Sequence, residues 1–164
     1  MPLEVYLQSA VVRGVLVTNQ DRLSNYLTLR GGDEVFSLRD ATLENLERKT
    51  VAAGSDEYLI YMQELFLIAD LSTQLRQDRP GLESLYVKKD TSRVLLSVGP
   101  YWLQGNIYIV PGGALHELLM SKTRFIPVTG AALLNRPELG PRTYLVNRTK
   151  IGFMTASGDF LVEL

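Results

Sequence analysis

The segment "VFSLRDATLEN" (Val35–Asn45) occurs a second time, in altered form, as "FIPVTGAALLN" (Phe125–Asn135). The two segments align without a gap, and the second begins 90 residues after the first. Three positions are identical: Ala41 and Ala131, Leu43 and Leu133, Asn45 and Asn135. Because self-similarity at a fixed period is the signature of repeated structural units, this match decides how the rest of the chain is interpreted.

Three more pairs of segments match in the same order along the chain. The pairs are "VVRGVLV" (Val11–Val17) with "WLQGNIYI" (Trp102–Ile109), "RLSNYL" (Arg22–Leu27) with "ALHELL" (Ala114–Leu119), and "YLIYMQELFLIA" (Tyr58–Ala69) with "YLVNRTKIGFMT" (Tyr144–Thr155). We therefore expect a tandem duplication, with a first copy over residues 1–72 and a second over residues 85–164. Residues 73–84, which are polar and contain Pro-Gly, are expected to form the linker.

Each copy is predicted to be mainly β with one short helical turn. Its first matched segment has the Val, Ile, Leu and Tyr composition of a strand, interrupted by Gly14 or Gly105, and a glycine inside a strand often marks a bulge or sharp bend. Asp21 is expected to cap the helical turn of the first copy, whose Leu23 and Leu27 lie four residues apart and would face the core. Five short strands in about 65–70 residues suggest a small Sm-like or SH3-like barrel.

The segment Val35–Asn45 is predicted to be a strand with Phe36 and Leu38 facing inward, and Ile126 and Val128 are the counterparts in the second copy. The polar "NRTK" at Asn147–Lys150 predicts a hairpin turn between two further strands.

Composition limits the kinds of site that the chain can form. There is no cysteine, which excludes disulfides, thiolate metal sites and thiol nucleophiles, and the single histidine, His116, cannot form a multi-histidine metal site. No cofactor or metal is therefore expected. No apolar run is long enough to cross a bilayer and no signal peptide is recognisable, so we expect a cytoplasmic protein without a membrane role.

Charge is distributed unevenly between the two halves. Residues 1–70 hold six Lys and Arg against eleven Asp and Glu, a net charge of −5, whereas residues 71–164 hold eleven against seven, a net charge of +4. This asymmetry is compatible with head-to-tail contact between unlike halves or chains, and the competing interpretation is drift in charge across two solvated surfaces.

The second copy, with "FIPVTGAAL" followed by "YLVNRTKIGFM", resembles a bacterial family of small, uncharacterised Sm-like domains. The first copy also resembles the first Sm motif, with Gly14, Asp21 and Asn25 as the matching residues. In Sm proteins the asparagine of that motif recognises uracil beside an aromatic or basic stacking residue, so the resemblance implies a role for Asn25. The Arg-Gly or Lys-Gly pair of the second Sm motif has no counterpart in either copy.

Basic and aromatic residues of the second copy suggest a nucleic-acid surface. Trp102 could stack on a base, while Arg124, Arg148 and Lys150 could contact phosphates. The competing interpretation is a solvated loop face beside core aromatics, and the sequence pI of about 5.9 argues against strong nonspecific binding.

Gly31 to Glu34 spell most of the Gly-Gly-Asp-Glu-Phe signature of diguanylate cyclases. Only 30 residues precede Gly31, and the corresponding loop of the second copy, "MSKTR" (Met120–Arg124), has no trace of the signature. A flexible turn before a strand explains the glycines.

No set of catalytic groups converges, so the sequence favours a non-enzymatic interaction or assembly module. The apolar "ELFLIADL" (Glu64–Leu71) is either a core strand or an edge strand that pairs with another chain. We expect a homo-oligomer, and a trimer would give the six barrels of an Sm-like ring; a different protein partner is a further possibility. The alternatives are binding of RNA or single-stranded nucleic acid, and small-molecule binding in a cleft between the copies.

Overall fold

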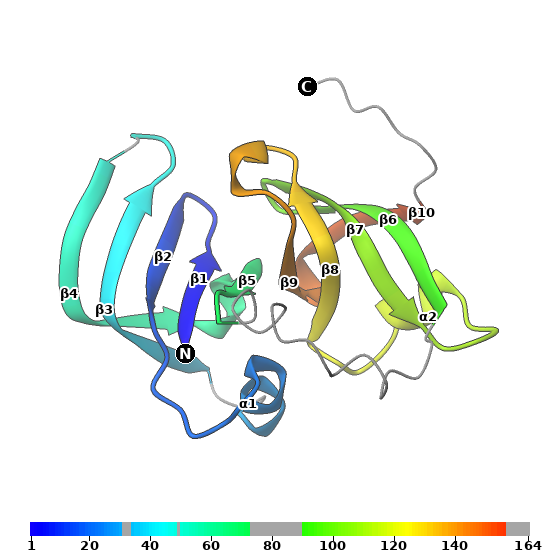
Figure 1. Cartoon of the computed structure of the whole chain (residues 1–164), viewed down its shortest axis with the longest axis horizontal. Coiled ribbons are helices and arrows are strands. Elements are labelled where there is room, and N and C mark those ends of the chain that lie inside the picture. Colours follow the sequence, from blue (N-terminus) through cyan, green and yellow to red (C-terminus); the bar gives the residue numbers. More distant parts are fainter. Residues whose placement is uncertain (31–33, 49, 73–89, 157–164) are drawn as a thin grey trace, which may run out of the picture. The chain divides into compact units, whose positions relative to one another are not determined.

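The computed structural model describes residues 1–30, 34–48, 50–72 and 90–156. The chain divides into two compact units, Met1–Arg79 and Pro80–Leu164, each built mainly from β-strands (Figure 1). The expected linker, residues 73–84, and the glycines of the cyclase-like signature lie outside the described residues.

Unit 1 is an antiparallel sheet with the strand order β5-β1-β2-β3-β4. Its strands are β1 (Pro2–Tyr6), β2 (Ala10–Val15), β3 (Val35–Asn45), β4 (Thr50–Tyr61) and β5 (Leu67–Asp70). The helix α1 (Leu23–Leu29) joins β2 to β3 and lies below the strands in Figure 1, and the 3₁₀ helix η1 (Met62–Glu64) joins β4 to β5.

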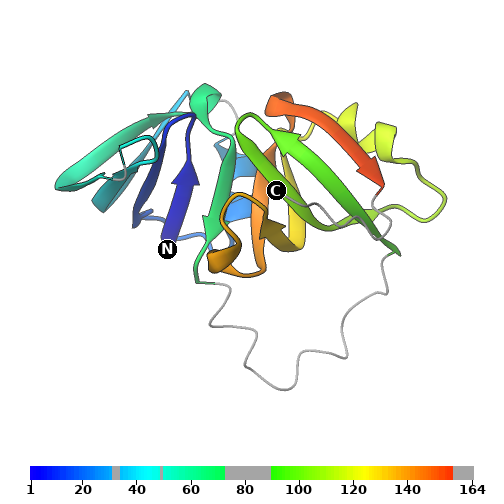
Figure 2. The same cartoon turned by 90° about the horizontal axis from the view of Figure 1, so that it is seen from above.

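Unit 2 is an antiparallel sheet with the strand order β10-β6-β7-β8-β9. Its strands are β6 (Asp90–Val98), β7 (Tyr101–Ile109), β8 (Phe125–Leu133), β9 (Arg142–Asn147) and β10 (Ile151–Ala156). Its helical segments are α2 (Leu115–Leu119), η4 (Pro137–Leu139) and η5 (Arg148–Lys150). Figure 2 shows β10, in orange-red, alongside β6, in green. In both units the fifth strand pairs with the first, and a 3₁₀ helix separates the fourth strand from the fifth.

Neither sheet is closed by hydrogen bonds within the described residues. The end strands β4 and β5 of unit 1 do not pair with each other, and the same holds for β9 and β10 of unit 2. The mainly β expectation is confirmed, whereas each sheet is an open, curled one and not a hydrogen-bonded barrel.

Each unit contains a β-bulge at the glycine that the sequence singled out. Opposite Gly14, the register between β2 and β3 shifts, so that two residues of β3 face one residue of β2. The same shift occurs opposite Gly105, between β7 and β8. A bulge bends the strand and increases its twist, and these two sites therefore curl the sheets as the sequence predicted.

The bulges require glycine because the facing strand approaches very closely. A Cβ atom at position 14 would lie 2.8 Å from the Cβ of Ala41, and one at position 105 would lie 2.7 Å from the Cβ of Ala131. The residue before each of these alanines has a left-handed backbone, with φ of 48° at Asp40 and 54° at Gly130. Aspartate and glycine are residues that tolerate this conformation.

The core of each unit is formed by alternating strand residues and, in unit 1, by one face of α1. Phe36, Leu38, Ile126 and Val128 are buried, as predicted from the alternation in their strands. Leu23 and Leu27 of α1 are buried too, which confirms the face assigned to this helix.

Two predictions of local structure were wrong. Asp21 does not cap α1, because Arg22 occupies the N-cap position and makes no side-chain cap. The "NRTK" segment is not a hairpin turn either: Asn147 accepts a hydrogen bond from the Thr149 N–H at 3.2 Å and starts η5, and β9 and β10 then lie at opposite ends of the strand order. The side-chain cap thus starts a helical turn where the polar composition predicted a hairpin turn.

Substitution of Gly105 by Ala is expected to destabilise the protein by about 1–3 kcal/mol, since the added methyl group overlaps Ala131 and Val128. Urea unfolding followed by circular dichroism measures this loss. The double variant Gly105→Ala/Ala131→Gly removes the nearest atom and should recover part of the stability. Equal stabilities of the single and double variants would contradict the steric explanation.

Candidate functional site

The five residues predicted to bind nucleic acid are distributed over both units. Asn25 is exposed on α1 of unit 1, and the other four belong to unit 2. Trp102 lies on β7, Arg124 immediately precedes β8, and Arg148 and Lys150 lie in η5. A main-chain hydrogen bond of 2.8 Å, from the Arg148 N–H to the Arg124 carbonyl oxygen, brings these two arginines together.

The guanidinium group of Arg148 holds the segment between α2 and β8. Its Nε donates to the carbonyl oxygen of Thr123 at 2.9 Å, and its NH1 donates to the carbonyl oxygen of Leu119 at 2.9 Å. The second of these bonds reaches the last residue of α2, where main-chain carbonyls lack helical partners. The geometry therefore gives Arg148 a structural role, which the sequence did not indicate.

Trp102 is one half of an aromatic pair on the outer face of unit 2. Its ring meets that of Phe153 edge to face, with the centroids 5.1 Å apart. Trp102 on β7 and Phe153 on β10 both pair with Ser97, which lies on the intervening strand β6. Both rings remain more than one third exposed. We call Trp102 and Phe153 the aromatic patch. The sequence did not predict Phe153 as a surface residue of interest, because no motif or charge marks it.

A second apolar surface lies on the outer face of unit 1. Leu59 and Tyr61 of β4 alternate with the buried Ile60, and Val35 of β3 pairs directly with Tyr61. Leu59 and Tyr61 are 67% and 56% exposed, which is high for residues of their size. We call Val35, Leu59 and Tyr61 the β4 patch. The alternation in Tyr58–Tyr61 was the available signal, but it does not say which face is covered.

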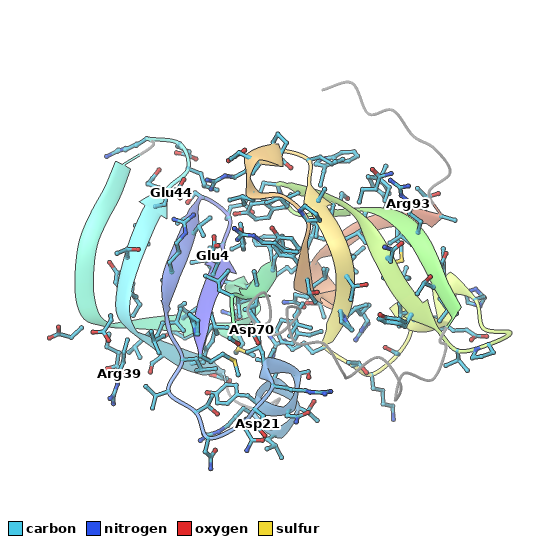
Figure 3. The ribbon with its side chains drawn as sticks, viewed as in Figure 1. Glu4, Asp21, Arg39, Glu44, Asp70 and Arg93 are labelled. Atoms are coloured by element: carbon cyan, nitrogen blue, oxygen red, sulfur yellow. The ribbon has the colours of Figure 1, made fainter. Side chains whose placement is uncertain are left out.

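Unit 1 also contains a charged cluster on β1, β2 and β3. Glu4 is buried, and its Oε2 accepts hydrogen bonds from Arg13 Nε and from the Tyr6 hydroxyl, both at 3.2 Å. Arg13 NH1 also donates to Glu44 Oε2 at 2.8 Å. Figure 3 labels Glu4 and Glu44 on the strands to either side of β2. The cluster satisfies a buried carboxylate, and its groups do not converge on a cavity.

Arg13 stays positively charged in this cluster. Burial lowers its pKa, but the hydrogen bond to Glu44 and the charges of Glu4 and Glu44 outweigh that effect, so that the pKa is raised above its ordinary value. The arginine is therefore a permanent countercharge and not a proton donor for chemistry.

One shallow hollow lies beside α1. It has a volume of about 430 Å³ and is lined by Val17, Thr18, Asn19, Gln20, Tyr26, Leu29 and Arg30. The Arg30 guanidinium lies over the Tyr26 ring, 6.0 Å from its centroid. Asn25 is not part of the lining.

Comparison with known proteins leaves the family open: no protein-family model, curated protein sequence or solved structure matches this chain. Within the described ranges, no three His, Asp or Glu residues cluster closely enough to hold a metal ion. Among the same residues, no helix is long and apolar enough to span a membrane.

Replacement of Arg148 by Gln should destabilise the protein by about 1–3 kcal/mol, because carbonyl oxygens near the end of α2 lose their charged donor. Denaturant unfolding gives this value. As a control, Lys122→Gln removes an exposed cation from the same segment and should leave stability within about 0.5 kcal/mol of the wild type. A destabilisation by Arg148→Gln no greater than that of the control would refute the structural role.

Replacement of Arg13 by Met removes the positive charge that is hydrogen-bonded to the buried Glu4 carboxylate and should cost about 1–3 kcal/mol. The matched variant Arg136→Met breaks an ion pair whose Glu138 side chain is 61% exposed, and it should cost below about 1 kcal/mol. Thermal unfolding of the two variants at neutral pH compares them directly. A larger loss for Arg136→Met would show that the Glu4 cluster contributes little.

Proposed function

We propose that this protein is a non-enzymatic assembly module made of two small, partly open barrels of the Sm-like or SH3-like kind. The shared strand order of the units, with a bulge at the same glycine in each, supports such barrels, because bulges curl a small sheet on itself. In this proposal the protein acts by associating with other copies of the same chain, and no residue has a catalytic role.

One observation carries the proposal: the end strands β4 and β10 expose large apolar side chains. Each of these strands hydrogen-bonds to one neighbour only, β4 to β3 and β10 to β6, within the described part of the chain. Leu59 and Tyr61 are exposed on β4, and Phe153 is exposed on β10. An edge strand with exposed apolar residues is a template for pairing with another chain, and charges or prolines oppose such pairing. Neither strand contains proline, and β4 carries two exposed charges, Asp56 and Glu57.

The strand expected to pair from the sequence, β5 within "ELFLIADL", is a poorer candidate. Leu67, Ile68 and Ala69 are buried, so their side chains are not available to a second chain. The counterpart of β5 in unit 2 is β10, whose side chains are mostly exposed. The proposed self-association therefore uses β4 and β10.

The partner that best fits these edges is a second copy of the chain. The half containing β4 carries a net charge of −5, and the half containing β10 carries +4, so that unlike halves attract and like halves repel. Contact between unlike surfaces forms a closed ring or a filament. A trimer with six barrels is the closed form that we propose.

Substitution of Leu59 by Lys is expected to weaken self-association by about 10–100-fold, because burial of a leucine side chain contributes about 1.5–3 kcal/mol. A lysine on an edge strand also opposes pairing. Light scattering coupled to size exclusion at micromolar concentrations should show an oligomer for the wild type and smaller species for this variant.

Leu29→Lys is the matched control, because Leu29 is a leucine of the same unit, is 71% exposed and belongs to α1 and not to an edge strand. This variant should keep the mass of the wild type. A wild-type protein that remains monomeric at these concentrations, or equal dissociation by both variants, would overturn the proposal.

The alternative function, binding of RNA or single-stranded DNA, has one observation in its favour. The aromatic patch offers two exposed rings on which bases could stack. Arg148, in contrast, already bonds two main-chain carbonyls. Fluorescence anisotropy with a labelled single-stranded oligonucleotide at low salt distinguishes the two functions: salt-dependent binding lost in Trp102→Ala supports this alternative, and absence of binding eliminates it.

A further inference from the structure

Equivalent positions of the two units differ sharply in exposure on the fourth strand. The alignment of Tyr58–Ala69 with Tyr144–Thr155 places Leu59 opposite Leu145 and Tyr61 opposite Asn147. Leu59 is 67% exposed and Leu145 only 8%, while Tyr61 is 56% exposed and Asn147 is fully buried. The surface that carries the β4 patch is therefore exposed in unit 1 and covered in unit 2.

On the second and fifth strands the difference in exposure is reversed: unit 2 is the more exposed of the two. Phe153 of β10 corresponds to Leu67 of β5, and Trp102 of β7 corresponds to Val11 of β2. Phe153 and Trp102 are 39% and 37% exposed, whereas Leu67 and Val11 are fully buried. The surface that carries the aromatic patch is thus covered in unit 1 and exposed in unit 2.

Each exposed patch consequently has an equivalent in the same chain that is covered. Monomeric proteins seldom leave clustered aromatic and aliphatic side chains in water, and such patches mark interaction sites. The two patches differ in sequence and lie in different units, so one chain offers two unlike apolar surfaces.

We infer that the aromatic patch of one copy receives the β4 patch of a second copy, with β10 of the first beside β4 of the second. This inference rests on the proposed self-association and specifies its contact. Leu59 of one copy lies against Phe153 of the other, and Glu57 is opposite Thr155 in the same antiparallel register. All four side chains are exposed, and on each strand the two residues lie two positions apart and therefore share one face.

Engineered cysteines test this contact cleanly, because the native chain has none. Directly opposed residues of antiparallel strands have Cα atoms about 4.5–5.5 Å apart, which is within the range that a disulfide bridges. The double variant Leu59→Cys/Phe153→Cys should give, after mild oxidation, a ladder of covalent oligomers on a non-reducing denaturing gel. Each single variant should run as a monomer, because the contact joins unlike surfaces.

A second pair keeps the apolar residues intact. Glu57→Cys/Thr155→Cys should give the same ladder, and it covers the case in which removal of Phe153 weakens the interface. The matched control is Leu59→Cys/Met120→Cys, since Met120 is 80% exposed in unit 2 but lies just beyond the end of α2 and on neither strand of the aromatic patch. The control should stay monomeric on the gel.

The outcomes separate this inference from the proposed function. If light scattering finds an oligomer but neither double variant gives a ladder, the contact is wrong and self-association stands. Covalent dimers from Leu59→Cys alone would indicate a symmetric contact between β4 strands and also overturn the inference. A wild-type protein that is monomeric by light scattering would contradict both the inferred contact and the proposed self-association.

Discussion

The close approach of strands at Gly14 and Gly105 is the constraint on which the rest of the structure depends. At each site a Cβ atom would lie less than 3.0 Å from the alanine of the facing strand, and two residues of that strand oppose the one glycine. The resulting bend gives each sheet its curl, which allows five short strands to enclose a core. The residue before each alanine, Asp40 or Gly130, has a left-handed backbone conformation and is part of the same bulge.

Much of this fold was predictable because its signals are local. A glycine within an apolar strand indicates a bulge, and the alternation of apolar residues was sufficient to assign Phe36, Leu38, Ile126 and Val128 to the core. The polar Asn147–Lys150 misled, since a single side-chain hydrogen bond turned an expected hairpin into a 3₁₀ helix. Whether this segment forms a hairpin or a 3₁₀ helix depends on which strand pairs with β10. That pairing is a long-range property, and local composition does not encode it.

The candidate surfaces were less predictable than the fold, for a physical reason. Trp102 stood out by residue type, but its partner Phe153 lies 51 positions away and the two meet only because both strands flank β6. Arg148 was expected to contact phosphate, yet its donors are directed at the carbonyls of Thr123 and Leu119. Residue type indicates what a side chain can bind, whereas only the fold decides what lies within its reach.

The charged cluster of unit 1 has a consequence for folding. Two units with the same strand order are at risk of exchanging equivalent strands, as tandem repeats do when they misfold. The positions of Glu4, Arg13 and Glu44 are occupied in unit 2 by Leu95, Gln104 and Leu134. A strand of unit 1 inserted among those of unit 2 would bury a carboxylate or a guanidinium group without its opposite charge, at a substantial cost. The ion pairs of Glu4 with Arg13 and of Arg13 with Glu44 therefore disfavour the exchange of strands between the two units.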